Sequence, residues 1–542
     1  MKTVNPTTSV VSGLAGLLLL LASASLFASS VPPEVQANGE RLTGFWAEAP
    51  VPVAGFTGIP FAAPPVGPLR WRAPRPHSPR DGQQTAQDFA AACIQGDGMV
   101  DWYAGVARAF GHGPEVVGRP VGTSEDCLYL NVWSPRLTPD AHLPVMVFVH
   151  GGSNRGGWSY EPDYLGHMLA AQGVVVVTIA YRLGPFGFFS HRALNNGDGE
   201  PVANFALLDI RAAFQWVHQN IGVFGGDPEN ITGFGESAGA FDLVDLILAD
   251  LDRGKVRQSL FSRLILQSTG GPPRSRRTLS EEQEIGDQLA GLLGLDSDVS
   301  AASLRSVPAA DLLAAAVELP DQHYFSAVID RMTLPDHPQD ILRRLQAKDV
   351  DLITGTNADE WLMYIGAEAT QKELTDWIAE NAPQHQAALL EMLAGEQDPR
   401  RALDIIRTAR RMMCPSRFLA SRINEKGGRA WVYYFDRQRS GPGGQELGAY
   451  HGAELPYVFD RHDSWLTTAA EDRALTVTMM DYWVQFARDG DPNIREHPAW
   501  PVYTGKEPVV MALGDRVRPV RDPSIELCEM LGPGSWQQEK EQ

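Results

Sequence analysis

Asn230-Ile-Thr-Gly-Phe-Gly-Glu-Ser-Ala-Gly239 is the stretch that decides the fold, because it joins an apolar strand to a helix through a glycine-flanked serine. The strand is predicted at 230–234 and the helix at 238–248. A serine on such a strand-to-helix turn projects from the sheet as a nucleophile. Glycines flank it because side chains there would collide with strand and helix. Ser237 is therefore the candidate nucleophile, although the pentapeptide alone also fits a glycine-rich turn with an inert serine.

Apolar runs that alternate with helical segments surround this turn. Apolar residues also recur at helical spacing from Leu207 to Ile221. This alternation predicts an α/β protein with a mostly parallel central sheet flanked by helices on both faces. Two Ala/Leu-rich helical regions, at about 272–346 and 370–422, are expected to lie outside the sheet as insertions that roof the site. The other predicted strands lie at 144–149, 173–179, 264–266, 350–354 and 430–435.

A glycine-rich segment, His150-Gly-Gly-Ser-Asn-Arg-Gly-Gly157, follows one of these strands and precedes the serine. Small residues let backbone N–H groups approach the carbonyl oxygen of a bound substrate and stabilise the oxyanion that forms on attack. The amides of Gly152, Ser153 and Ala238 are the candidates for this oxyanion hole. A flexible glycine loop without a binding role is the alternative.

A nucleophilic serine needs a histidine base and an acid that orients it, in the chain order serine, acid, histidine. His451 follows the last predicted strand and is the best candidate base among 13 histidines. Asp359 and Glu360 follow the strand predicted at 350–354, and functional groups gather at the carboxyl ends of such strands. The chemistry alone does not choose between these two acids.

The composition limits the partners and cofactors. The chain of 542 residues is 44% hydrophobic and 21% charged, which is typical of a globular protein, and its formal net charge is −20. That charge argues against a nucleic-acid partner and weakly favours a polar or cationic substrate. No cysteine and histidine spacing typical of zinc is present, so neither a metal nor an organic cofactor is expected.

The N-terminal residues have the layout of a secretory signal peptide. Lys2 precedes an apolar run from Val10 to Leu21, and small residues follow up to Ser30. The run is shorter than the roughly 20 residues of a spanning helix, so no stable membrane anchor is expected. We therefore expect residues 1–30 to be removed, a secreted or periplasmic location, and a single domain over 31–542.

The expected export affects whether the cysteines form disulfides. An even number in an oxidising compartment indicates disulfides, and the pairing has three possibilities. Buried free thiols are the alternative. The four cysteines are Cys93, Cys127, Cys414 and Cys528.

Further motifs run along the chain in a fixed order. They are Phe56-Thr-Gly-Ile-Pro-Phe-Ala-Ala-Pro-Pro-Val-Gly67, Ser124-Glu-Asp-Cys-Leu-Tyr-Leu-Asn-Val-Trp133, Phe224-Gly-Gly-Asp-Pro228, Gly490-Asp-Pro-Asn493 and Trp500-Pro501. With the serine turn, they make the chain resemble the type-B carboxylesterases, the family that includes cholinesterases and bacterial esterases. The resemblance implies the α/β-hydrolase fold. It also implies hydrolysis of small carboxylic esters through a Ser-His-Glu triad and an acyl-enzyme.

The resemblance also assigns individual residues. It implies that Glu360 is the acid, that Ser268 helps to orient that acid, and that Glu236 lies near the base. Glu236 would then tune His451, or would simply be a buried, hydrogen-bonded acid. The disulfides implied are Cys93–Cys127 and Cys414–Cys528.

Several residues depart from the family pattern. Ser153 replaces a glycine of the oxyanion loop, and Asn154 replaces a residue that is commonly aromatic, which should make the pocket more polar. Trp361 replaces the glycine after the acid and would strain the turn if that position had a positive φ. Asp242 and Asp245, on the helix after the nucleophile, are interpreted as structural. The basic run 274–277 is interpreted as a solvated turn.

Two other function classes remain open at this stage. Some relatives of this fold are non-catalytic binding or adhesion proteins, which typically lack a triad member. A lipase or a transesterase would use the same residues on a different substrate. Neither the physiological ester nor the oligomeric state follows from the sequence.

Overall fold

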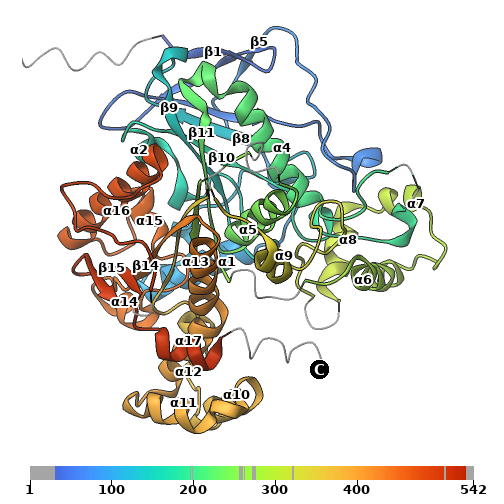
Figure 1. The fold of residues 1–542 in the computed structure, drawn as a ribbon. Coiled ribbons are helices and arrows are strands. Elements are labelled where there is room, and N and C mark those ends of the chain that lie inside the picture. The colour runs from blue at the N-terminus through green and yellow to red at the C-terminus, as the bar shows by residue number, and fades with distance from the viewer. Residues whose placement is uncertain are drawn as a thin grey trace, which may run out of the picture.

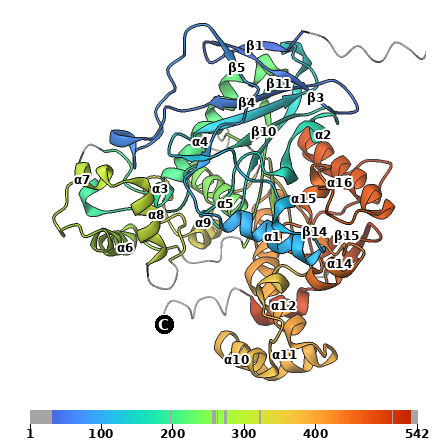
Figure 2. The same ribbon diagram turned by 180° about the vertical axis from the view of Figure 1, so that it is seen from behind.

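A computed structural model describes residues 31–532 apart from 196, 198, 255–259, 262, 271–275, 320–322, 349, 506 and 507, so the predicted signal peptide lies outside the described residues. A large mixed sheet forms the centre of the molecule (Figures 1 and 2). From one edge to the other its strands are β16 (Arg518–Arg521), β15 (Val509–Leu513), β14 (Arg429–Phe435), β13 (Asp351–Asn357), β12 (Arg263–Gln267), β11 (Gly226–Glu236), β9 (Leu143–Val149), β10 (Val175–Ile179), β8 (Tyr129–Ser134), β4 (Val53–Pro60) and β3 (Phe45–Ala47).

The middle of the sheet is parallel, as predicted. Every pair from β10 through β9, β11, β12, β13 and β14 to β15 is parallel, whereas β16, β8, β4 and β3 add antiparallel pairs at the two edges. All five residues of β10 are buried, which is typical of a parallel strand covered on both faces. The antiparallel edges were not predicted.

Helices cover both faces of the sheet (Figures 1 and 2). On β9, Val145, Val147 and Val149 belong to the apolar core shared with α4 (Phe205–Asn220), α5 (Ser237–Asp252) and α13 (Cys414–Glu425). Met146 and Phe148 alternate with those valines and belong to the other core, which α16 (Ala470–Asp489) and α2 (His167–Ala170) complete. The period of two along the strand therefore fills two cores.

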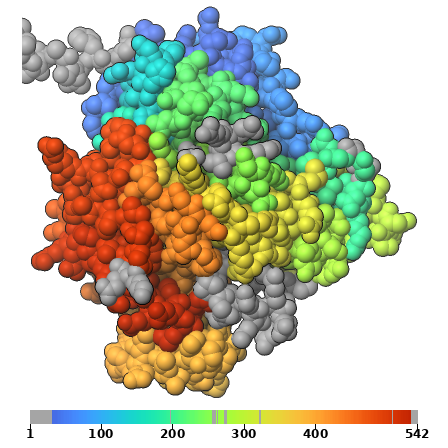
Figure 3. All heavy atoms as spheres, viewed as in Figure 1, coloured from blue at the N-terminus to red at the C-terminus, as the bar shows by residue number. Residues whose placement is uncertain are grey.

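Two groups of helices lie outside this three-layered body. One comprises α6 (Leu279–Leu292), α7 (Ala301–Ser306) and α8 (Ala309–Val317). The other comprises α10 (Gln371–Asn381), α11 (Gln386–Met392) and α12 (Pro399–Thr408), and it projects from the body as a separate lobe (Figure 3). Leu374, Ile378, Leu389 and Leu403 of this lobe belong to a third apolar cluster, which Cys414 and Leu531 at its base also join.

The remaining elements are short. A small sheet combines β1 (Glu34–Ala37), β2 (Glu40–Thr43) and β5 (Gln83–Thr85), and β6 (Ala92–Cys93) pairs with β7 (Thr123–Ser124). The other helices are α1 (Gly98–Ala109), α3 (Gly184–Gly187), α9 (Pro338–Arg344), α14 (Pro442–Leu447), α15 (Leu455–Val458) and α17 (Ile525–Leu531). None of the helices that the structure describes is long and apolar enough to span a membrane.

Both disulfides implied by the family resemblance are present. Cys93 is bonded to Cys127, and Cys414 is bonded to Cys528. The second bond joins the start of α13 to α17, close to the base of the projecting lobe (Figure 1). The alternative of free thiols was wrong.

Candidate active site

Ser237 stands at the junction of β11 and α5, where the chain turns sharply. Its φ is 51°, a left-handed conformation that costs free energy for a residue with a side chain. A Cβ at Gly235 would lie 2.9 Å from the carbonyl oxygen of Val149, and one at Gly239 would overlap the same oxygen. The two glycines therefore let the turn press against the end of β9, which is the steric reason given for them from the sequence.

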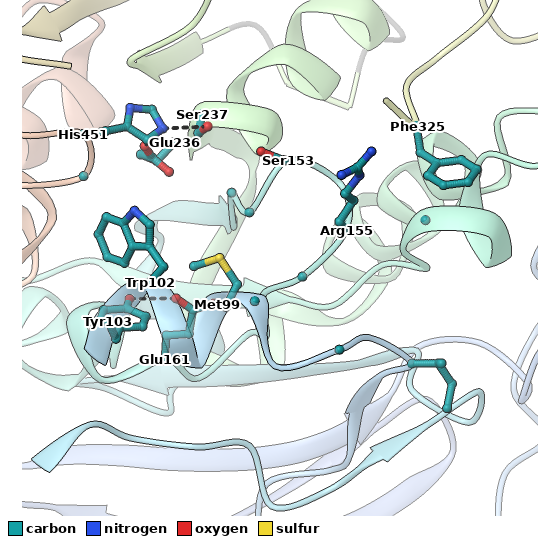
Figure 4. A pocket seen from close by; sticks show the side chains of 18 of the residues that line it. Met99, Trp102, Tyr103, Ser153, Arg155, Glu161, Glu236, Ser237, Phe325 and His451 are labelled. Carbon is teal, nitrogen blue, oxygen red and sulfur yellow. Dashed lines mark hydrogen bonds and ion pairs between the residues drawn. The ribbon is translucent and has the colours of Figure 1, made fainter. Parts of the chain in front are cut away.

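Three predicted side chains meet at this turn. His451 Nε2 lies 2.9 Å from Ser237 Oγ (Figure 4), and His451 Nδ1 lies 2.6 Å from Glu360 Oε2. Glu360 is fully buried. Asp359, the other candidate acid, turns away and accepts the N–H of Ala449 at 2.7 Å. The geometry thus singles out Glu360 as the partner of the histidine.

Glu360 is held by a backbone group rather than by the predicted serine. Its Oε1 accepts the N–H of Asn357 at 2.8 Å. The Asn357 side chain donates to Glu454 at 2.6 Å, and Glu454 also accepts from Gln267 at 3.0 Å. Within the described chain the buried hydroxyl of Ser268 has no hydrogen-bond partner, so the orienting contact expected of it is absent. Asn357 and Glu454 were missed, because no local pattern marks residues that act through tertiary contacts.

Glu236 adds a second carboxyl group beside the base. Its Oε1 lies 3.1 Å from His451 Nε2. Burial raises the pKa of Glu236 to about 8, although His451 opposes that rise. Burial disfavours a charged His451, but Glu236 and Glu360 outweigh burial and raise the pKa of the imidazole to about 10. The site therefore stabilises the imidazolium that forms when the histidine takes a proton.

The loop predicted to form the oxyanion hole comes close to the serine. Gly152 and Ser153 line the same cavity as Ser237 and have φ values of 95° and 58°. A Cβ at Gly151 would lie 3.0 Å from the Cβ of Ser237, so the loop has no room for a side chain there. Ala238 is buried in the first turn of α5, directly after the serine, and is not among the residues lining the cavity.

Asn154 does not make the pocket polar, contrary to the prediction. Its side chain is buried beneath the loop, where Nδ2 lies 3.4 Å from Asp242 Oδ1 and Oδ1 accepts the hydroxyl of Tyr181 at 3.3 Å. Asp245 forms a buried ion pair with Arg276 at 3.0 Å. The two unusual aspartates are therefore structural, as interpreted. Residues 274 and 275 of the basic run lie outside the described residues, and Arg276 is buried rather than solvated.

Trp361 does not strain the turn after the acid. Its φ is −102°, an ordinary value for a residue with a side chain, and its N–H donates to Asp404 at 2.8 Å. The position does not require glycine in this chain, so the departure from the family pattern leaves Glu360 in place.

A cavity of about 610 Å³ opens above the serine. Its walls come from α1, from α8 and from the segments around Phe325 and Tyr364. Figure 4 shows Trp102 of α1 and Phe325 among them. The first helical insertion therefore roofs the site as predicted. The projecting lobe of α10–α12 supplies none of the described lining residues, so that part of the prediction was wrong. Among the described residues no cluster of His, Cys, Asp or Glu is suited to a metal ion.

Comparisons with known proteins agree with this geometry. The model of the carboxylesterase family matches residues 32–527. The chain is 32% identical to para-nitrobenzyl esterase of Bacillus subtilis over 505 residues, which cover 88% of this chain and 94% of that protein. It is 32% identical to acetylcholinesterase of Electrophorus electricus over 569 residues, covering 87% and 82% of the two chains.

Solved structures give the same result. A PNB esterase structure matches with a TM-score of 0.75 at 29% identity, covering 92% of this chain and 100% of the other. A carboxylesterase structure from Geobacillus stearothermophilus matches with a TM-score of 0.77 at 29% identity, covering 93% and 100%. The chain belongs to the carboxylesterase family, has the α/β-hydrolase fold, and is a carboxylic-ester hydrolase.

Proposed function

We propose that the protein hydrolyses carboxylic esters by two-step acyl transfer, with Ser237 as nucleophile, His451 as general base and acid, and Glu360 as the group that orients the base. The observation that carries the proposal is the continuous pair of contacts, 2.9 Å from Ser237 to His451 and 2.6 Å from His451 to Glu360. Such a chain of contacts activates a hydroxyl group that is otherwise a weak nucleophile.

In the first step Ser237 Oγ attacks the ester carbonyl carbon while His451 accepts the hydroxyl proton. The amides of Gly152, Ser153 and Ala238 stabilise the oxyanion, and this interaction is stronger in the transition state than in the bound ester. His451 then gives its proton to the departing alcohol, which leaves an acyl group on Ser237. In the second step His451 removes a proton from water, which attacks the acyl carbon. The bond between that carbon and Ser237 Oγ then breaks, His451 returns the proton to Oγ, and the acid is released.

The test is hydrolysis of p-nitrophenyl butyrate by the purified protein and by Ser237→Ala. We expect kcat/KM to fall by about 10⁴-fold or more in the variant. An organophosphate should label the parent at Ser237 and leave the variant unlabelled, while circular dichroism checks that both are folded. Full hydrolysis by a folded Ser237→Ala protein would refute the mechanism.

We further propose that the protein acts outside the cytoplasm, after removal of residues 1–30. The N-terminal sequence pattern supports export, and the disulfides Cys93–Cys127 and Cys414–Cys528 fit an oxidising compartment. N-terminal sequencing of the protein recovered from cell fractions tests this. A cytoplasmic protein that retains Met1 would contradict it.

A further inference from the structure

The charged groups that line the cavity are divided between its two sides. Glu236 lies beside His451 and Glu161 lies beside Tyr103, and both stand to the left of Ser153 in Figure 4. Arg155 lies on the other side of Ser153, toward Phe325 (Figure 4). No other lysine or arginine lines the cavity among the residues that the structure describes. The cavity therefore has an acidic side and a basic side.

The acidic side is already committed to contacts within the protein. Glu161 accepts the hydroxyl of Tyr103 at 2.7 Å and the N–H of Trp158 at 2.9 Å. Asp163 is buried close to Glu161. Burial raises the pKa of Glu161 to about 7 and that of Asp163 well above its usual range. An anionic substituent on this side would meet carboxyl groups and, among the described lining residues, no lysine or arginine.

The basic side is tied to the oxyanion loop. Arg155 follows Ser153 by two positions, and its side chain is exposed to the cavity. Its guanidinium donates to the carbonyl oxygen of His323, on the segment that leads to Phe325. The loop proposed to hold the substrate carbonyl therefore also carries the cation.

The chemistry of the base then decides which part of an ester faces this cation. His451 must reach the leaving alcohol to protonate it, so the alcohol lies on the His451 side. Arg155 and Phe325 line the cavity on the other side of Ser153, which is the side left for the acyl group. We propose that the preferred substrates carry a carboxylate on the acyl group, as hemiesters of dicarboxylic acids do, and that Arg155 binds this carboxylate. The inference rests on the proposed function, because it needs Ser237 as the nucleophile and His451 as the base.

The test compares p-nitrophenyl hemiglutarate with p-nitrophenyl valerate, a neutral ester of similar acyl length, at about 0.15 M salt, where long-range repulsion by the net negative charge is screened. A hydrogen-bonded charge pair contributes about 1.5–3 kcal/mol, so the parent should favour the hemiester in kcat/KM by about 10- to 100-fold. Arg155→Gln should abolish that preference, and Arg155→Lys should retain part of it.

A matched control removes the same charge elsewhere. Arg343 is exposed on α9, pairs with Asp340 and does not line the cavity. Arg343→Gln should leave the ratio of the two kcat/KM values unchanged. An equal fall of the ratio in both variants would overturn the inference, because net charge rather than a local contact would then explain it.

Binding without turnover gives a second measurement. Glutarate should inhibit the parent competitively and more strongly than valerate, and Arg155→Gln should lose the difference. If Ser237-dependent hydrolysis of the valerate ester is observed without any preference for the hemiester, the acyl-carboxylate inference is wrong and the esterase proposal stands. If a folded Ser237→Ala protein still hydrolyses the valerate ester, both the inference and the esterase proposal are wrong.

Discussion

The floor of the cavity and its walls are built in different ways. Ser237 and Glu360 follow parallel strands of the sheet, are buried, and are held by hydrogen bonds or by close backbone packing. The walls come from Trp102 on α1, Leu313 on α8 and Tyr364, which lie far apart in the chain and are partly exposed. Several contacts therefore fix the position of each floor residue, whereas the position of each wall residue depends on the packing of one helix or segment.

This difference separates chemistry from selectivity. A group that moves protons must keep its position within a few tenths of an ångström, and the sheet provides that rigidity. A wall residue only has to exclude or admit part of a substrate. Changes in the floor should therefore lower the rate for every ester, and changes in the walls should alter the ratio between esters.

The largest effect is expected from loss of the base. His451→Ala should lower kcat/KM for p-nitrophenyl butyrate by about 10⁴-fold or more, and adding Ser237→Ala should cost at most about threefold further, because triad members act as a unit. Steady-state kinetics of the two single variants and the double variant check this. Losses that multiply would show that the two residues act independently.

A second test compares Glu360, which contacts the base, with Ser268, which was predicted to orient Glu360. Glu360→Gln should lower kcat by about 10³- to 10⁴-fold, because the amide leaves the imidazole in the wrong tautomer. Ser268→Ala is the matched control and should change kcat by less than about threefold, since its hydroxyl makes no hydrogen bond in the described chain. A loss of 100-fold in Ser268→Ala would mean that the serine does orient the acid.

The pH profile probes the electrostatics of the floor. The base must be neutral to accept a proton, so activity rises with pH through the pKa of His451, which Glu236 helps to raise. Glu236→Gln removes this carboxyl group, which should lower the pKa of His451. The acidic limb of kcat/KM should then move to lower pH by about one unit. The pH dependence of kcat/KM for both proteins is the measurement. An unmoved limb would assign the titration to another group.

The smallest effect is expected in the walls. Leu313→Ala should lower the preference for p-nitrophenyl octanoate over the acetate by about three- to tenfold, while acetate hydrolysis changes less, because only the longer acyl chain reaches the wall. Val477, which is exposed on α16 and does not line the cavity, provides the control Val477→Ala. Equal losses on both esters would remove the distinction between floor and walls.

Much of the floor could be predicted from the sequence, because its residues follow strands that have a clear apolar pattern. The pattern placed Ser237 and His451 but left Asp359 and Glu360 open, since neighbouring residues on one turn differ only in the direction of their side chains. The backbone N–H of Asn357 fixes the direction of the Glu360 side chain. Only the family resemblance selected Glu360 over Asp359.

The errors have a common physical cause. Asn154 and Arg276 look like residues of exposed loops, yet each is buried against an aspartate of α5. The helices of the projecting lobe have the apolar stripe of a packed helix, but a stripe does not say which surface it meets, and here the helices meet one another. A local sequence pattern does not reveal that a residue will be buried against a partner far away in the chain.

The disulfide Cys414–Cys528 closes a covalent ring with a sequence separation of 114, and this ring contains β14, β15, β16 and the histidine loop. A protease that nicks the chain once inside the ring leaves both fragments bonded to each other. His451 then stays attached to the half of the molecule that carries Ser237 and Glu360. The bond therefore keeps all three residues in one covalently linked molecule after a single cut between Cys414 and Cys528.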